Sequence, residues 1–282
     1  MATGFFTDTT ICIGCKACEV ACKQWNELPS DGFEFSGDSY DNTGSLSGTT
    51  WRHVSFVEQL SPEPAGAEDR WLMMSDVCKH CTHAGCMEAC PTGAIIRNEF
   101  NNVFVQPDIC NGCGYCVVSC PFGVVDLIAK VNEPRHADYN DATLNQEREH
   151  TSQTALQGSG GVAAKCTLCY DRQKIGMVPA CAKACPTESI QFGEIEELRE
   201  RASKRVEALQ ERGLPAYLYG AGNEGSVGDL NAFFLLIDKP EAYNLPAEPV
   251  LPSTRQPAGY VSAALTAALL TLLGLAVFKG AK

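Results

Sequence analysis

Basic side chains are scarce in this sequence. Its 282 residues include 22 Lys and Arg against 34 Asp and Glu, a formal net charge of -12 at pH 7. A protein that binds nucleic acid mainly through phosphates needs a basic face, so the sequence argues against a nucleic-acid partner and favours a protein partner. With 20% charged and 45% hydrophobic residues, the composition also excludes overall disorder and collagen-like repeats. The length suits about two domains of typical size.

Cysteine, in contrast, is abundant. The 16 cysteines fall into four groups of four with none left over. A disulfide between cysteines with only two residues between them would be strained, and its short loop would constrain little of the unfolded chain. Clustering this complete therefore predicts metal sites. The groups are Cys12, Cys15, Cys18, Cys22; Cys78, Cys81, Cys86, Cys90; Cys110, Cys113, Cys116, Cys120; and Cys166, Cys169, Cys181, Cys185.

The spacing within the groups predicts iron-sulfur clusters. The first and third groups read C-x2-C-x2-C-x3-C, in which three thiolates bind one cube and the fourth binds a neighbouring cube. The other two groups each lengthen one spacing, and proline follows three of the four groups. Zinc is the alternative, because it also binds paired C-x2-C units. It does not explain the distant fourth cysteine, so we expect four 4Fe-4S clusters.

Motifs that complete each other in pairs can be paired in three ways. Ile95–Arg97 and Val103–Val105 predict a short hairpin between the second and third motifs, so these two motifs form one compact unit, inserted into a unit built from the first and fourth. The scheme predicts four ligand sets: Cys12, Cys15, Cys18, Cys185 (cluster 1); Cys78, Cys81, Cys86, Cys120 (cluster 2); Cys110, Cys113, Cys116, Cys90 (cluster 3); and Cys166, Cys169, Cys181, Cys22 (cluster 4).

Cationic side chains beside the cysteines are expected to raise the reduction potentials of the clusters, because they stabilise the added electron. Solvated surface lysines are the simpler interpretation of each one taken singly. The candidates are Lys16, Lys23, Lys79, Lys165, Arg172 and Lys183. His80 and His83 flank Cys81, but the sixteen thiolates leave no metal position for them, so we expect ordinary polar or shielding roles.

We expect an α+β fold: two interleaved ferredoxin-like two-cluster domains plus one C-terminal transmembrane helix. Residues 52–59 and 70–74, around a turn with Pro62 and Pro64, predict a hairpin that extends the inserted unit. Residues 131–161 read as a loop, 194–212 as an amphipathic helix and 231–238 as a strand. The domains are unit A (1–50 and, after the loop, 131–192), unit B (51–130), an extension (193–256) and the membrane helix (257–279).

Gly220, Gly222 and Gly225 match the pattern G-x-G-x-x-G of dinucleotide sites. That pattern must leave a strand and open a helix. Here it is expected to follow the helix of residues 194–212 and to precede a strand. We therefore interpret it as a flexible turn.

Residues 258–278 contain no charged side chain. At 1.5 Å per residue this segment spans roughly 31 Å, the thickness of a bilayer core, and predicts a transmembrane helix rather than a buried core helix. Its alanines favour a neighbouring membrane helix. Lys279 and Lys282 favour a cytoplasmic C-terminus, with the cluster domain outside the cytoplasm. No secretory signal precedes Cys12, so export is expected to depend on a partner's signal.

Several segments resemble a known family. Cys12-Ile-Gly-Cys15-Lys-Ala-Cys18, Cys110-Asn-Gly-Cys113-Gly-Tyr-Cys116 and Lys165-Cys166-Thr-Leu-Cys169-Tyr-Asp-Arg172 resemble the four-cluster iron-sulfur subunits of molybdopterin oxidoreductases. The helix from Glu194, the turn at Leu218-Tyr219 and the segment Pro240-Glu-Ala-Tyr243-Asn-Leu-Pro246 before a single C-terminal helix resemble the membrane-anchored β subunit of respiratory formate dehydrogenase of the N or O type.

The resemblance implies a subunit that is not catalytic itself. It implies electron transfer from a formate-oxidising α subunit, with a molybdenum or tungsten bis-pterin, to a γ subunit with cytochrome b that reduces quinone. It implies the inner (cytoplasmic) membrane, export on the partner's twin-arginine signal and the crossed cysteine pairing. Two alternatives stay open: the same role in a hydrogenase, polysulfide or sulfoxide reductase complex, and a zinc-binding membrane adaptor.

Overall fold

The computed structural model describes residues 1–282 except 31–39, 42, 61–68, 130–160, 223–224 and 281–282. At its centre lies a four-stranded sheet with the strand order β8-β1-β10-β9. Strand β1 (Thr3–Asp8) runs antiparallel to β8 (Ile190–Glu194) and parallel to β10 (Ala232–Leu236), and β9 (Tyr217–Tyr219) is antiparallel to β10. Both ends of the sequence therefore contribute to one sheet.

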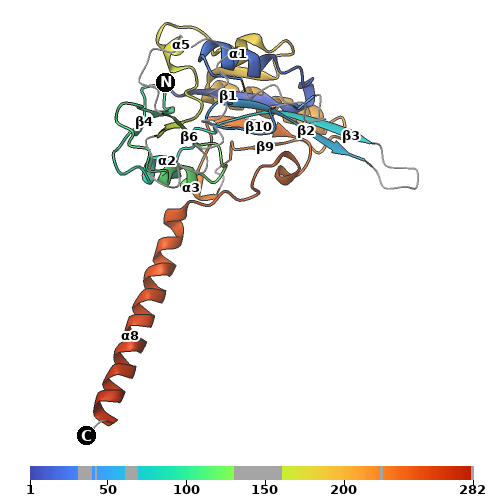
Figure 1. Ribbon diagram of the computed structural model, residues 1–282. Coiled ribbons are helices and arrows are strands. Elements are labelled where there is room, and N and C mark those ends of the chain that lie inside the picture. Colours follow the sequence, from blue (N-terminus) through green and yellow to red (C-terminus); the bar gives the residue numbers. More distant parts are fainter. Residues whose placement is uncertain (31–39, 42, 61–68, 130–160, 223–224, 281–282) are drawn as a thin grey trace.

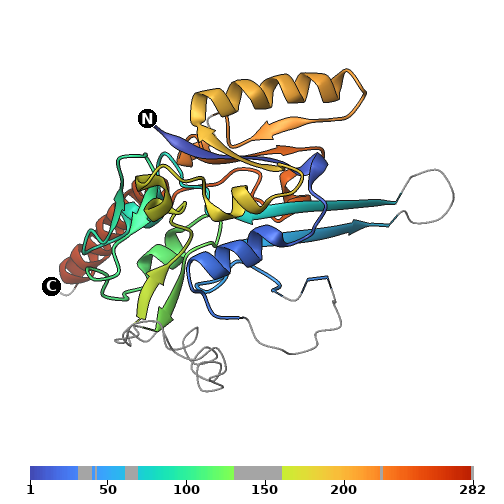
Figure 2. The same cartoon turned by 90° about the horizontal axis from the view of Figure 1, so that it is seen from above.

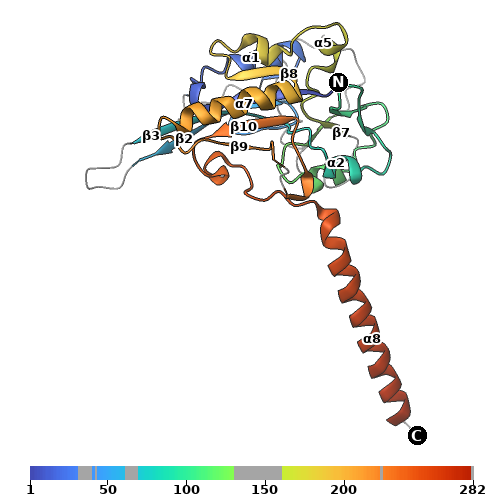
Figure 3. The same ribbon diagram turned by 180° about the vertical axis from the view of Figure 1, so that it is seen from behind.

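Side chains of β1 alternate between the two faces of this sheet, as the period of a strand requires. Phe6 packs with Phe233 and the apolar face of α7 (Ile195–Gln210), where Leu198 and Leu209 are buried. Phe5 points into the core on the other side, which also contains many of the cysteines. The predicted helix and the strand of residues 231–238 are thus confirmed, and Figure 3 shows α7 lying along the sheet.

Two predicted hairpins are confirmed. Strands β2 (Arg52–Gln59) and β3 (Arg70–Val77) pair from Arg52 opposite Val77 to Gln59 opposite Arg70 and extend beyond the body (Figure 2). Residues 61–68, with the predicted turn, lie outside the described residues. The second hairpin joins β4 (Ile95–Arg97) and β5 (Val103–Val105).

A third antiparallel pair, β6 (Asp126–Ala129) with β7 (Gly161–Ala164), was not predicted. Most of the loop expected for residues 131–161 lies outside the described residues, but its last residue, Gly161, begins β7.

Short helices carry the cysteine motifs. Helix α1 packs on α6, and α2 packs on α3, so the first motif meets the fourth and the second meets the third. The β2–β3 hairpin lies against α1 and the turn η1 of the first motif. These helices are α1 (Ala17–Trp25), α2 (Gly85–Glu88), α3 (Tyr115–Ser119), α5 (Tyr170–Lys174) and α6 (Ala180–Ala184); the short 3-10 turns are η1 (Thr9–Ile11), η3 (Gly225–Val227), η4 (Pro240–Tyr243) and η5 (Pro252–Arg255).

Two expectations around residue 220 were wrong. Leu218 and Tyr219, expected in a turn, belong to strand β9, where Leu218 is paired with Leu235. The glycine-rich stretch therefore leaves a strand and not a helix. It still opens only the three-residue turn η3 before β10, so no helix of useful length follows whose N-terminus would bind a phosphate.

Helix α8 (Gln256–Gly280) extends away from the body, as Figure 1 shows. Among the described residues, one helical stretch, Pro252–Leu275, is long and apolar enough to cross a membrane, and its apolar part is not buried against the rest of the protein. Leu265, Leu269 and Leu272 are all exposed. Such a row of solvent-facing leucines needs an apolar environment to cover it.

Candidate iron-sulfur cluster sites

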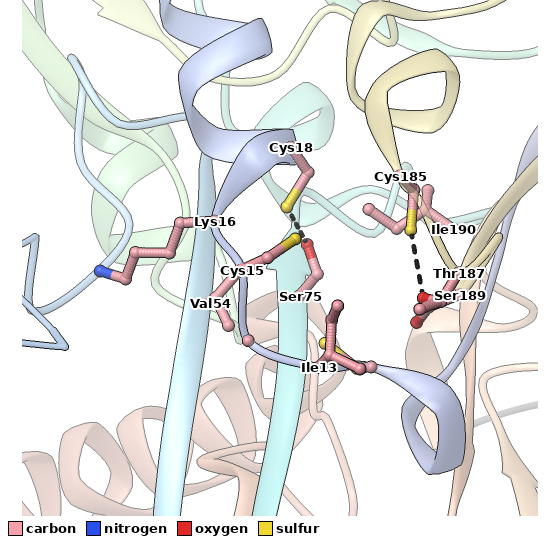
Figure 4. A pocket seen from close by; sticks show the side chains of 12 residues that line it. Ile13, Cys15, Lys16, Cys18, Val54, Ser75, Cys185, Thr187, Ser189 and Ile190 are labelled. Atoms are coloured by element: carbon pink, nitrogen blue, oxygen red, sulfur yellow. Dashed lines mark hydrogen bonds between the residues drawn. The ribbon is translucent and has the colours of Figure 1, made fainter.

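Four cysteines from distant parts of the chain line one pocket beside α1. Cys12, Cys15 and Cys18 come from the first motif and Cys185 from the fourth, and Figure 4 shows Cys18 and Cys185 on opposite sides of it. These residues are the ligand set predicted for cluster 1. Ser75 Oγ, from strand β3, lies 3.2 Å from Cys18 Sγ. A thiolate that binds iron has no proton to give, so the serine hydroxyl is the donor in the loaded site.

A second pocket is lined by the set predicted for cluster 3. Cys110, Cys113 and Cys116 come from the third motif and Cys90 from the second. The backbone N–H of Ala163, in strand β7, donates to Cys110 Sγ at 3.3 Å. Such hydrogen bonds to ligand sulfurs are one of the means by which a protein sets a cluster potential.

The other two predicted sets lie deeper in the protein. Burial raises the pKa of Cys81 well above its ordinary value, and the nearby thiols of Cys78, Cys120 and Cys86 raise it further. These four residues are the set predicted for cluster 2.

The set predicted for cluster 4 shows the same pattern. Burial and then the thiols of Cys166, Cys181 and Cys169 raise the pKa of Cys22 well above its ordinary value. The linings of the two pockets and these electrostatic neighbours are consistent with the predicted groups, and all sixteen cysteines are free thiols; the ligand sets themselves stay a prediction.

All four motifs share one backbone feature. The residue before the second cysteine has a positive φ in each: Gly14 at +65°, His80 at +47°, Gly112 at +72° and Leu168 at +55°. A left-handed backbone conformation costs a non-glycine residue roughly 1–2 kcal/mol. The motifs that contain His80 and Leu168 therefore keep this turn in spite of the backbone strain. At Gly14 a Cβ would lie 2.6 Å from Phe56 Cε1, and at Gly112 it would overlap the carbonyl oxygen of Gly161.

No group of three His, Cys, Asp or Glu side chains among the described residues is placed to hold a single metal ion. A zinc site needs ligand sulfurs about 2.3 Å from one ion.

Comparison with known proteins identifies the kind of domain. A family model described as a 4Fe-4S dicluster domain matches residues 11–94, and a second model with the same description matches residues 69–153 and 152–195. Two dicluster domains correspond to four 4Fe-4S clusters. This result decides between the iron-sulfur and the zinc interpretation.

Curated relatives match over most of the chain. It is 39% identical over 249 residues to the formate dehydrogenase iron-sulfur subunit of Haemophilus influenzae, covering 86% of this chain and 68% of that protein. It is 37% identical over 252 residues to the formate dehydrogenase-O iron-sulfur subunit of Escherichia coli (strain K12), covering 88% and 72%. This chain belongs to the family of formate dehydrogenase iron-sulfur subunits.

A relative with lower identity is named for a different oxidoreductase. A probable anaerobic dimethyl sulfoxide reductase chain of Escherichia coli (strain K12) is 31% identical over 203 residues, covering 70% of this chain and 76% of that protein. The relatives are thus subunits of formate dehydrogenase or dimethyl sulfoxide reductase complexes, which implies a catalytic partner. The chain described here is an iron-sulfur electron-transfer subunit of a formate dehydrogenase-type complex.

Buried cations show that the protein fits such negatively charged groups. Lys165 is 2% exposed, and its Nζ donates to Cys78 Sγ at 3.4 Å and to the backbone oxygens of Val103 and Cys166. Lys79 is buried, forms an ion pair with Asp76 and lies over the Phe122 ring. Isolated buried charges are strongly unfavourable. Lys79 already has Asp76 as its partner, whereas beside Lys165 a thiolate-ligated cluster would supply the negative charge, and bound clusters would pass single electrons between them.

The other predicted cations have different surroundings. Lys16 pairs with Glu19 and Asp41, and Lys23 donates to backbone and hydroxyl oxygens of Pro29, Thr49 and Thr50. Arg172 is buried against the Trp25 ring, 4.1 Å from its centroid, and Lys183 is exposed.

One buried cation was missed by sequence reasoning. Arg52 begins strand β2, and no sequence signal relates it to a cysteine motif. His80, in contrast, accepts a hydrogen bond from the backbone N–H of Val103, an ordinary structural role.

Proposed function

We propose that this chain conducts electrons one at a time from a formate-oxidising catalytic subunit, with a molybdenum or tungsten bis-pterin, to a membrane subunit with cytochrome b that reduces quinone. The chain performs no bond chemistry itself. The percentage identity to the formate dehydrogenase subunits is higher than that to the sulfoxide reductase relative, and the match covers a larger share of this chain. Both differences support formate as the electron source.

The proposed ligand sets are the four groups of cysteines described above, and their exposure supports one order of clusters. Cys15 and Cys113 are the two exposed cysteines of the chain. They belong to clusters 1 and 3, so these two clusters form the ends of the path. Clusters 2 and 4 lie between them, where burial excludes water.

Electrostatic effects between the sets support the order within the path. Burial raises the pKa of Cys18, the Arg52 charge and the Ser75 hydroxyl oppose that rise, and Cys181 of the cluster 4 set adds to it. Burial and then Cys78 raise the pKa of Cys166, which relates cluster 4 to cluster 2. Burial raises the pKa of Cys86 and Lys165 opposes that rise; Cys116 of the cluster 3 set adds to it after the two thiols of the cluster 2 set, which relates cluster 2 to cluster 3. The proposed order is cluster 1, cluster 4, cluster 2, cluster 3.

The position of α8 supports one direction for this path. Ser253, just before α8, donates a hydrogen bond to Glu88 in α2 at 2.8 Å, and Figure 1 shows α8 leaving the body beside α2 and α3. The cluster 3 end therefore faces the membrane, where the quinone-reducing subunit lies. The cluster 1 end faces the catalytic subunit. Exposed Ile13 and Val20 at that end are suited to a protein interface.

The proposed location is the inner membrane, with α8 as a single span and the cluster domain on the extracytoplasmic side. The apolar exposed surface of α8 and the two lysines after it support this location. Export would use the twin-arginine signal of the catalytic partner. The proposed interleaving of unit A around unit B is supported by the packing of α1 on α6 and of α2 on α3.

The decisive experiment uses the complex purified anaerobically in detergent through a tag on this chain. Formate is added, and reduction of the clusters is followed by electron paramagnetic resonance. Reduction by formate places the chain after a formate-oxidising subunit. If dithionite reduces the clusters while formate does not, with the catalytic subunit present and active on an artificial acceptor, the electron path stands and formate as its source is wrong.

A further inference from the structure

The side chain of Arg52 is enclosed at the centre of the protein, and in the part of the chain that the structure describes it forms no ion pair with an acidic side chain. It is 1% exposed. Its Nη1 donates to the backbone oxygen of Ser75 at 3.2 Å and to Ser75 Oγ at 3.0 Å, and its guanidinium carbon lies 4.7 Å from the Phe5 ring centroid. Nε and Nη2 are buried and have no hydrogen-bond partner among the described residues. Within the described ranges, two charged donors therefore face the interior without a protein acceptor.

The groups around Arg52 belong to two different ligand sets. Burial alone would lower the pKa of Arg52, but the charges of nearby cysteines outweigh it and raise the pKa above its ordinary value. One of these cysteines, Cys18, is a proposed ligand of cluster 1. The others are proposed ligands of cluster 4: Cys181, Cys166 and Cys22.

Ser75 connects Arg52 to one of these sets directly. Its hydroxyl accepts a hydrogen bond from Arg52 Nη1, which leaves its own proton for Cys18 Sγ at 3.2 Å (Figure 4). The guanidinium of arginine has only hydrogen-bond donors. The two hydrogen bonds therefore run from Arg52 to Ser75 and from Ser75 to Cys18. The positive charge polarises the serine hydroxyl, which strengthens its hydrogen bond to the sulfur.

We propose that Arg52 is a charge shared by clusters 1 and 4, and that it raises the reduction potentials of both, acting on cluster 1 partly through Ser75. The proposal rests on the ligand sets of the proposed function, not on formate as the electron source. A cube with four thiolates changes from about −2 to about −3 when it accepts one electron. A fixed buried cation stabilises the reduced state more than the oxidised state, because the charges are weakly screened in the interior.

This arrangement has a consequence for electron flow at the entrance of the path. Two neighbouring reduced cubes repel each other, and a cation shared between them lowers that repulsion. Because Arg52 cannot lose its proton at accessible pH, its effect is constant across the pH range in which the complex is active. The charge of Arg52 thus favours the first electron-transfer step, from cluster 1 to cluster 4, by lowering the repulsion between the two clusters.

The test is a redox titration of the purified complex, poised with dithionite and mediators and followed by electron paramagnetic resonance. Arg52→Gln should lower the midpoint potentials of two of the four clusters, each by about a tenfold change in the reduction equilibrium, or 59 mV for a one-electron couple. Ser75→Ala should lower only one, and that cluster should be one of the two shifted by Arg52→Gln. Arg52→Lys keeps the charge and should remain closer to the wild-type potentials than Arg52→Gln.

The matched control is Arg70→Gln, which removes an arginine from the other strand of the same hairpin, where it pairs with Asp238. It should leave all four potentials unchanged. Iron and acid-labile sulfide are measured on every variant. A fully loaded Arg52→Gln complex with unchanged potentials, or with all four shifted alike, overturns the proposal.

If Arg52→Gln fails to load its clusters, the other two variants decide. The shared charge is then supported by a lowered potential of one cluster in Ser75→Ala together with small shifts in Arg52→Lys. Unchanged potentials in Ser75→Ala overturn it. Dithionite replaces formate throughout, so these outcomes do not depend on whether formate is the natural donor.

Discussion

Lys165 Nζ lies 3.4 Å from Cys78 Sγ although the two residues are 87 positions apart. Lys165 directly precedes Cys166, so a single residue joins the proposed site of cluster 4 to that of cluster 2. This contact relates the two buried clusters in the middle of the proposed path. The same lysine donates to the backbone oxygen of Val103 in β5, so it also holds the second hairpin in place.

Lys165→Met should lower the midpoint potential of the cluster bound by Cys78, because a buried positive charge beside its ligand is lost. The variant should also be less stable by about 1–3 kcal/mol, since the Val103 oxygen is left without this donor. Redox titration and thermal unfolding under argon measure the two effects. Lys183→Met removes an exposed lysine next to the ligands and should leave the potentials nearly unchanged, because solvent screens its charge. Equal shifts in the two variants would contradict the role given to burial.

Cys18→Ser should damage the cluster bound by Cys185 and spare the one bound by Cys166, because Cys18 lines the same pocket as Cys185. Cluster-resolved electron paramagnetic resonance at matched iron content makes the distinction. Cys22→Ser is the matched variant, four residues along the same helix, and should damage the other cluster. The crossed ligand sets are refuted if the two variants lose the same signal.

Gly112→Ala should prevent cluster 3 from forming properly, because φ is +72° and a Cβ would overlap the Gly161 carbonyl oxygen. Gly93→Ala is the control: its φ is +65°, yet nothing lies within 4 Å of an added Cβ. That variant should pay only the backbone strain of roughly 1–2 kcal/mol and keep all four clusters. Iron content and the cluster spectra of both variants are compared. Equal cluster loss in both would show that backbone strain, not the contact with β7, is the deciding factor.

Deletion of residues 256–282 should leave a cluster domain with its full iron content that alkaline carbonate extracts from membranes, because α8 projects from the body. The full-length chain should need detergent. Replacing residues 258–278 by an uncharged polyleucine helix should restore membrane anchoring but removes the alanine face. This variant therefore tests separately whether that face contacts a neighbouring membrane helix. Membrane retention of the deleted chain under carbonate would argue against α8 as the anchor.

The sequence predicted the parts of the structure whose signals are local. Cysteine spacing indicates the cluster type because the ligands of one cube come mostly from one short loop. Helix α7 shows helical periodicity, and the strands of both predicted hairpins are apolar or β-rich runs on either side of residues that favour a turn. Strand β1 escaped prediction because its side chains are buried on both faces and its partners, β8 and β10, lie near the other end of the chain.

Other features carry no sequence signal at all. Strand β9 has only three residues, too few for a period-2 pattern, so Leu218 and Tyr219 read as a turn. Arg52 is far in sequence from the cysteines whose charge surrounds it. Only the pairing of β2 with β3, which sets Arg52 opposite Val77 and brings Ser75 within reach, reveals its position.

The pairing of β1 with β8 and β10 sets an order of maturation during synthesis. All proposed ligands of clusters 2 and 3 lie between Cys78 and Cys120, so a nascent chain of that length already offers two complete binding sites. Cys12 through Cys22 leave the ribosome earliest but wait for Cys166 through Cys185, and β1 waits longer still for β10. Under the proposed ligand sets, the first cysteines to be made are among the last to receive iron, and during that interval they would depend on the cell's protection from oxidation.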